Sequence, residues 1–170
     1  TRAGPSVESR PAMPIDLYQR PGFLLRRAHQ ISAAVFESAC AGLGLTPAQY
    51  GVLRLLAEEP GIDQTRLARA LAFDKVTVMR VLRGLEDRGL VERRASGRLT
   101  TVCLSEAGHA TLAAARAPAE AAYQRLMSPL SAAQREQLVA LLTTLTDGLA
   151  DEARAPFVPV PTADSTPAGV

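Results

Sequence analysis

The stretch that decides the fold runs from Asp74 to Arg94 and reads DKVTVMRVLRGLEDRGLVERR. Asp74 is a favourable helix N-cap and Gly89 a favourable C-terminal stop, so we expect a helix from Lys75 to Arg88. Apolar residues within it recur at helical spacing and predict one inward-facing stripe, formed by Val78, Leu82 and Leu85.

The residues on either side complete a compact unit. A short helix is expected from about Gln64 to Leu71, and Ala72-Phe73 links it to the next helix. After the second helix, two segments alternate enough for short strands, Val91–Arg94 and Leu99–Leu104, with Ala95-Ser96-Gly97 as the turn. Two short helices with a tight link, the second followed by a hairpin, are typical of a winged helix-turn-helix.

Four more helices are expected around this unit. They are Phe23–Leu43, a helix that Thr46-Pro47 opens and that ends before Pro60-Gly61, an alanine-rich helix from Ser105 to about Met127, and a last helix from Ala132 to about Ala153. Pro118 should kink the alanine-rich helix. The predicted fold class is mainly α with one hairpin (α+β).

The pattern suggests a single domain, 17–153, with the winged unit at 46–104. The helices of 17–45 and 105–153 should pack together as a dimerisation region, because an isolated helix cannot bury its own apolar stripe. The flanks, 1–16 and 154–170, hold seven of the twelve prolines and many small polar residues, so we predict disordered tails there.

Charge is unevenly distributed along the chain. The net charge is only +2, but seven basic residues face three acidic ones between Lys75 and Arg98, whereas the chain from Leu99 onward has four basic and seven acidic residues. A basic stretch of this kind indicates a polyanionic partner. The alternative is a solvated charged face.

The outward and N-terminal residues of the Lys75–Arg88 helix are the expected DNA contacts, since a recognition helix presents its N-terminal residues to base edges. Arg80 suits a bidentate bond to guanine, and Thr77 a thymine methyl or a phosphate. The backbone N–H groups of Gln64 and Thr65 can meet a phosphate. Lys75, Val76 and Arg83 complete this set. The alternative is an amphipathic helix of another α-rich protein.

Four motifs resemble the MarR family of bacterial transcriptional regulators. They are LTPAQY (45–50), DKVTVMR (74–80), LEDRGLVERR (85–94) and LSEAG (104–108), in the family's order and nearly its spacing. The resemblance covers about Leu17 to Ala153. It implies a two-fold homodimer held by the first and last helices, with winged modules that grip a palindromic operator in double-stranded DNA, usually as a repressor.

The wing departs from the family's pattern. Members usually carry an Asp-x-Arg motif between the two strands, with the Arg in the minor groove. Here the segment from Arg93 to Leu99 is shorter and contains no Asp. The resemblance therefore transfers the minor-groove role to Arg98, the basic residue left near the tip.

The resemblance also implies a small aromatic acid that releases the protein from DNA. Tyr50 and Arg54 share a helix face, so Tyr50 can stack on a ring and Arg54 can pair with a carboxylate. The first helix offers further polar groups, which span more than one face: Arg26, Arg27, His29 and Gln30. Core packing for Tyr50, an ion pair with Glu58 for Arg54 and a merely exposed imidazole for His29 are open alternatives.

The segment PGFLLRRAHQI (21–31) is similar to MarR members that control aromatic-acid catabolism. This similarity implies an effector that is an aromatic carboxylate or its coenzyme A thioester. In thioester sensors, arginines in this region can face the coenzyme A phosphates, as Arg26 and Arg27 would here.

Other functions find less support. No metal cluster, phosphate-binding glycine loop or nucleophile motif is present, so we expect neither an enzyme nor a cofactor. A cysteine-based redox sensor is an alternative, but Cys40 and Cys103 do not match the family's sensing position, and buried thiols are favoured. A helical protein-interaction module would not explain the basic stretch. Without a signal core or a run of about 18 apolar residues, we expect a cytoplasmic protein that does not contact the membrane.

Overall fold

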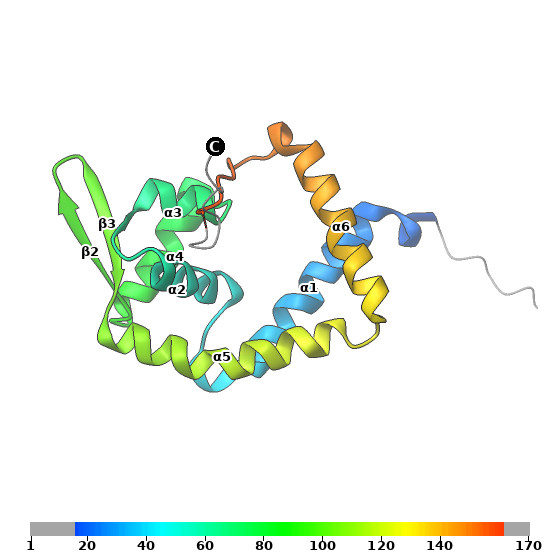
Figure 1. Ribbon diagram of the computed structural model, residues 1–170, viewed down its shortest axis with the longest axis horizontal. Coiled ribbons are helices and arrows are strands. Elements are labelled where there is room, and N and C mark those ends of the chain that lie inside the picture. Colours follow the sequence, from blue (N-terminus) through cyan, green and yellow to red (C-terminus); the bar gives the residue numbers. More distant parts are fainter. Residues whose placement is uncertain (1–15, 162–170) are drawn as a thin grey trace, which may run out of the picture.

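The computed structural model describes residues 16–161 as a frame of long helices with a winged module at one end (Figure 1). The elements follow in the order η1 (Asp16–Gln19), α1 (Pro21–Ala39), η2 (Ala41–Leu43), α2 (Pro47–Glu58), β1 (Ile62–Asp63), α3 (Gln64–Ala70), α4 (Lys75–Asp87), β2 (Val91–Ser96), β3 (Leu99–Leu104), α5 (Glu106–Met127), α6 (Ala132–Gly148) and η3 (Ala150–Glu152). The mainly α fold class with a winged helix-turn-helix is confirmed.

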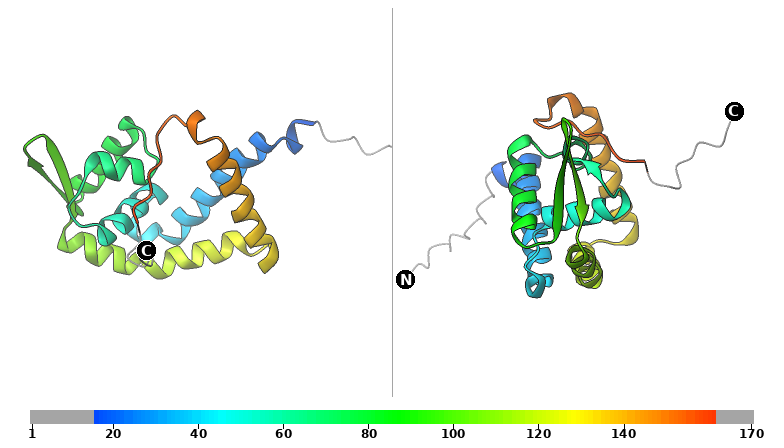
Figure 2. Two further views of the ribbon diagram at one scale, coloured as in Figure 1. Left: turned by 45° about the horizontal axis from the view of Figure 1, so that its top comes forward. Right: turned by 90° about the vertical axis from the view of Figure 1, so that its left-hand side faces the viewer.

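The sheet has three antiparallel strands in the order β1-β3-β2. The sequence did not predict β1, whose two residues pair with β3 through Ile62↔Val102 and Asp63↔Thr101. The β2–β3 hairpin is closed by a two-residue turn, because Ser96 pairs with Leu99. Strand β2 is thus two residues longer than predicted, and the hairpin projects beyond the helices (Figures 1 and 2).

The hydrophobic core lies inside the winged module and is aliphatic. Its fully buried side chains come from α2, α3, α4, β3 and the end of α1, namely Leu53, Leu56, Leu67, Leu82, Leu85, Val52, Val102 and Cys40. From α5, Leu112 and Ala115 also belong to this core. Helix α5 therefore joins the winged module to the rest of the frame.

Local capping explains where the helices begin. Thr46 and Gln49 form a capping box at α2, and Ser131 and Gln134 form another at α6. Ser105 caps α5 through a 3.0 Å bond from the Gly108 N–H. All three starts were predicted from the sequence, and α5 continues as a helix through Pro118.

The three long helices are unequally packed. Helices α1 and α5 pack against each other, and α5 buries Ala122 in addition to its core residues. Helix α6 buries none of its residues and displays Val139, Leu141, Leu142, Leu145 and Leu149, which are 37–60% exposed. Nothing within residues 16–161 buries this stripe.

The segment after η3 corrects one prediction. Residues 154–161 were expected to be part of a disordered tail, but they form an extended strap that returns to the winged module (Figure 2). Ala155 is buried, Val160 packs against the core, and the Val158 N–H donates to the Arg69 carbonyl at 3.0 Å. The strap thus bonds to a carbonyl in the last turn of α3, a contact between distant segments that proline content alone does not reveal. The remainder of that predicted tail (162–170) and the N-terminal one up to residue 15 lie outside the described residues.

No helix between residues 16 and 161 is long and apolar enough to cross a membrane.

Candidate nucleic-acid interface and ligand cleft

Helix α4 begins where the sequence predicted. The Asp74 carboxylate accepts a 2.6 Å bond from the Thr77 N–H. Bonds from the backbone and hydroxyl of Thr77 hold the pKa of Asp74 below its ordinary value. A negative charge at this position also suits the positive end of the helix dipole.

The burial pattern of α4 separates an inner and an outer face. Val78, Leu82 and Leu85 are buried as predicted, and Val81 joins them. The outer face carries Lys75, Val76, Met79, Arg80 and Arg83, all exposed, while Thr77 is half-buried. The three basic residues predicted on α4 therefore lie free of the core.

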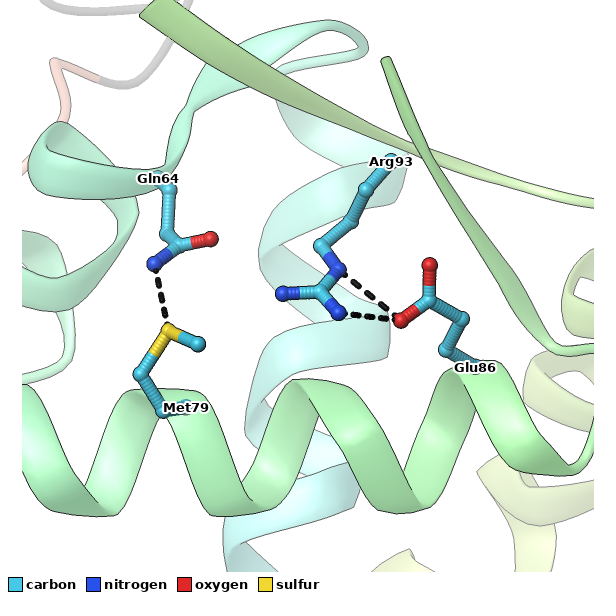
Figure 3. A network of polar contacts seen from close by, with 4 residues as sticks. All are labelled: Gln64, Met79, Glu86 and Arg93. Atoms are coloured by element: carbon cyan, nitrogen blue, oxygen red, sulfur yellow. Dashed lines mark hydrogen bonds and ion pairs between the residues drawn. The ribbon is translucent and has the colours of Figure 1, made fainter. Parts of the chain in front are cut away.

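Helix α3 approaches α4 at its first residue (Figure 3). The Gln64 side chain donates from Nε2 to the Met79 Sδ at 3.0 Å. The Asp63 carboxylate accepts bonds from the N–H groups of Thr65 and Arg66, each at 3.0 Å. The Thr65 N–H, which was expected to meet a phosphate, is bonded to Asp63 in this structure. The exposed Thr65 hydroxyl is the group that can reach a partner.

The wing is tied to the recognition helix by a short-range ion pair. Arg93 on β2 donates to the Glu86 carboxylate from Nε at 2.9 Å, and its Nη2 bonds the same oxygen (Figure 3). The hydrogen bonds from Arg93 lower the pKa of Glu86. Arg98 is exposed in the two-residue turn, beside Gly97 with φ +60°. The pair thus fixes the base of the hairpin, while its tip presents Arg98.

A cleft lies between α2 and α5 and has a volume of about 540 Å³. From α2 it is lined by Tyr50, Arg54 and Glu58, and from α5 by Arg116, Ala119, Glu120 and Tyr123. In the part of the chain that the structure describes, Arg54 and Glu58 form no ion pair, so that interpretation of Arg54 is wrong. The guanidinium groups of Arg54 and Arg116 are therefore available to an anionic ligand.

An apolar cavity of about 230 Å³ continues the cleft toward α1. It shares Tyr50, Ala119 and Tyr123 with the cleft and adds Ser32, Phe36, Pro47, Ala122 and Leu126. The rings of Phe36 and Tyr50 lie 5.4 Å apart at an interplanar angle of 48°. Tyr50 therefore packs against an aromatic neighbour, as the core-packing interpretation expects, and also lines the cleft. That its ring stacks on a ligand stays a prediction.

The predicted residues of the first helix are not brought to this cleft. Arg26, Arg27, His29 and Gln30 lie in the first half of α1 and are exposed, ahead of the turn that reaches the cavity. The Arg26 guanidinium instead lies 5.3 Å from the centre of the Phe23 ring.

The α5 side of the cleft was missed by sequence reasoning. A signal was present: Arg116, Glu120 and Tyr123 are spaced four and three residues apart, so they share one face. They are also large polar or aromatic residues within a run of alanines.

The cysteines fit a structural role better than a reactive one. Cys40 is 1% exposed, and burial raises the pKa of its thiol, which disfavours the reactive thiolate. Cys103 is half-buried on β3. Within residues 16–161, no group of three or more potential metal ligands comes together.

Comparisons with known proteins agree with this architecture. The sequence model of the MarR family matches residues 43–98. The HTH-type transcriptional repressor Rv2887 of Mycobacterium tuberculosis is 34% identical over 127 residues, which cover 73% of this chain and 91% of that protein.

Solved structures are similar over most of the chain. The transcriptional repressor CouR bound to a 23-mer DNA duplex is 34% identical, with a TM-score of 0.70, over 76% of this chain and 94% of that one. Bordetella bronchiseptica BpsR, whose DNA binding is regulated by 6-hydroxynicotinic acid, is 30% identical, with a TM-score of 0.73, over 79% of this chain and 99% of that one. These relatives are regulators, which confirms that the chain is not an enzyme. The chain belongs to the MarR family of transcriptional regulators.

Proposed function

We propose that the protein is a ligand-responsive, DNA-binding repressor that acts as a homodimer on a palindromic operator. The observation that carries this proposal is the outer face of α4, where Lys75, Arg80 and Arg83 stand exposed beside a projecting wing. No acidic residue occurs between Lys75 and Arg83, so this part of the helix is suited to a polyanion.

Each DNA contact follows from chemistry and position. Arg80 takes a guanine edge in the major groove, with Val76 and Thr77 beside it, and Lys75 and Arg83 take phosphates. Gln64 and Thr65 approach the backbone from α3, and Arg98 enters the minor groove. The similarity to CouR, solved on a DNA duplex, supports this placement.

A homodimer is proposed from the apolar surface that the described part of the chain leaves exposed. The exposed stripe of α6 is joined by Leu24, Leu25 and Ile31 on α1, which are 43–49% exposed. Apolar side chains in such number favour burial against a second copy. Light scattering at micromolar concentration tests this, and a monomer would refute it.

The proposed effector is an aromatic carboxylate or its coenzyme A thioester. The apolar cavity and the rings of Tyr50 and Tyr123 suit an aromatic group, while Arg54 and Arg116 suit an anion at the mouth. BpsR responds to 6-hydroxynicotinic acid, and CouR, 32% identical in a second structure, is solved with p-coumaroyl-CoA. For a thioester, Arg26 and Arg27 are the candidate phosphate contacts.

The experiment measures DNA binding by fluorescence anisotropy with and without a panel of aromatic acids and their thioesters. DNA upstream of the protein's own gene is the first probe, and affinity should fall with rising salt. An effector should release the DNA from the wild type and much less from Arg54→Ala or Arg116→Ala. Arg125→Ala, which changes an exposed arginine of α5 outside the cleft, is the control. Equal responses in all four proteins would refute the carboxylate anchor.

A further inference from the structure

The outer face of α4 contains an apolar patch, formed by Val76 and Met79. Val76 is 77% exposed and Met79 is 40% exposed, although the same helix buries four other aliphatic side chains. The two residues are three positions apart and therefore adjacent on the helix surface. Because both side chains lie on the outer face of α4, they do not contribute to the hydrophobic core.

The surroundings of the patch identify its partner by charge. Lys75 precedes Val76, Arg80 follows Met79, and Arg83 lies one turn further along the same face. A protein partner with an apolar surface would have to bury these cations, whereas DNA neutralises them with its phosphates. In the major groove the apolar group that a base presents is the C5 methyl of thymine.

The Met79 side chain is also held in place. The amide of Gln64 on α3 donates to its sulfur at 3.0 Å, so the thioether lies against the start of α3 (Figure 3). A methionine side chain has three rotatable bonds, and fixing them on binding costs conformational entropy. Because the bond from Gln64 already restricts Met79 in the free protein, less of this entropy is lost on binding.

We propose that Val76 and Met79 recognise thymine methyl groups, and that each operator half-site carries thymine next to the base read by Arg80. This inference rests on the proposed DNA binding and specifies which bases that site selects. Gln64 acts in it as a positioning residue for Met79.

The test begins with selection of binding sites from a random DNA library by the full chain. Each thymine of the selected site is then replaced by deoxyuridine, which lacks only the methyl group. We expect at least one replacement per half-site to weaken wild-type binding about fourfold, the factor that burial of one methyl-sized group provides. In Val76→Ala or Met79→Ala, the ratio of the affinity for thymine DNA to the affinity for the deoxyuridine DNA should fall to about one.

Two controls separate recognition from general loss. Lys75→Ala should weaken binding to both DNAs and keep the ratio of the wild type. Gln64→Ala should reduce the ratio partly, as a positioning role requires. Melting temperatures of the variants should match that of the wild type, since the altered side chains are exposed or half-buried.

The outcomes distinguish this inference from the proposal beneath it. Salt-sensitive binding with no methyl dependence at any thymine would overturn the inference and leave DNA binding intact. Methyl dependence that persists in both alanine variants, or alanine variants that bind the selected DNA as the wild type does, would also overturn it. Failure to select any DNA would overturn both.

Discussion

Gly108 lies at the joint between the wing and α5, and Gly108→Ala should destabilise the protein. A Cβ built on Gly108 would stand 2.0 Å from the Leu90 carbonyl oxygen and 3.3 Å from Leu104 Cδ2. The closer atom belongs to the backbone, so it cannot rotate away. That carbonyl also accepts the Ser105 N–H at 3.1 Å, and moving it strains the bond that begins α5.

The expected change in the free energy of unfolding is the sum of three contributions. Overpacking costs about 1–3 kcal/mol, and weakening one backbone hydrogen bond costs about 1 kcal/mol. The better helix propensity of alanine returns about 1 kcal/mol. The expected net loss is therefore about 2 kcal/mol, or roughly 4–8 °C in melting temperature for a chain of this size.

The assay is thermal and urea denaturation of the variant beside Gly148→Ala. Gly148 ends α6, and a Cβ there would meet nothing within 4 Å. We expect the control to be as stable as the wild type or slightly more so. If Gly108→Ala matched the control, the close approach to Leu90 would not be a real constraint on the fold.

Three further predictions concern contacts that the structure makes explicit. Arg80→Ala should weaken operator binding by about 1–3 kcal/mol and relax preference at one base position; equal loss on all sequences would make Arg80 a phosphate contact. Glu86→Gln should lower the free energy of unfolding at about pH 7, and the difference from the wild type should vanish as the pH falls toward about 3. The bonds from Arg93 lower the pKa of Glu86 in the folded protein below its ordinary value of 4.5. The ionised carboxylate therefore stabilises the fold above pH 4.5, and this stabilisation is lost as the pH falls through the folded-state pKa. A difference in urea denaturation between variant and wild type that did not change with pH would contradict this prediction. Val158→Pro, which removes the N–H bonded to Arg69, should speed hydrogen exchange in residues 153–161; Val158→Ala keeps that donor and should not, and equal exchange in both would show that the strap does not depend on this bond.

The winged module was predictable because its signals are local. Asp74 as the cap of α4, the buried stripe ending at Leu85 and the hairpin after it all follow from periodicity and turn chemistry. Strand β1 was not predictable in the same way, since two residues carry no periodicity. It exists because β3 offers a free edge at Val102.

In the candidate site, too, the residues with local sequence signals were predicted and those that depend on distant contacts were not. The outer residues of α4 were found because their exposure follows from the helix period, and Arg54 was found from its spacing to Tyr50. Arg116 and Tyr123 were missed because their role depends on α5 lying against α2, a contact between distant segments. The strap after η3 was missed for a related reason, because the carbonyl to which it bonds belongs to α3.

Helix α2 offers a physical route between the two proposed sites. One face of it buries Val52, Leu53 and Leu56 in the core that α4 shares, while the other directs Arg54 into the cleft. At the contact with α4, a Cβ on Gly84 would lie 3.3 Å from the Gln49 amide, so the helices leave little free space there. An effector wedged between α2 and α5 would press on a helix that is packed against the recognition helix. Because a close-packed interior transmits displacement, we expect occupancy of the cleft to move the outer face of α4 relative to the long helices, and this is the movement by which the proposed effector would release the proposed operator.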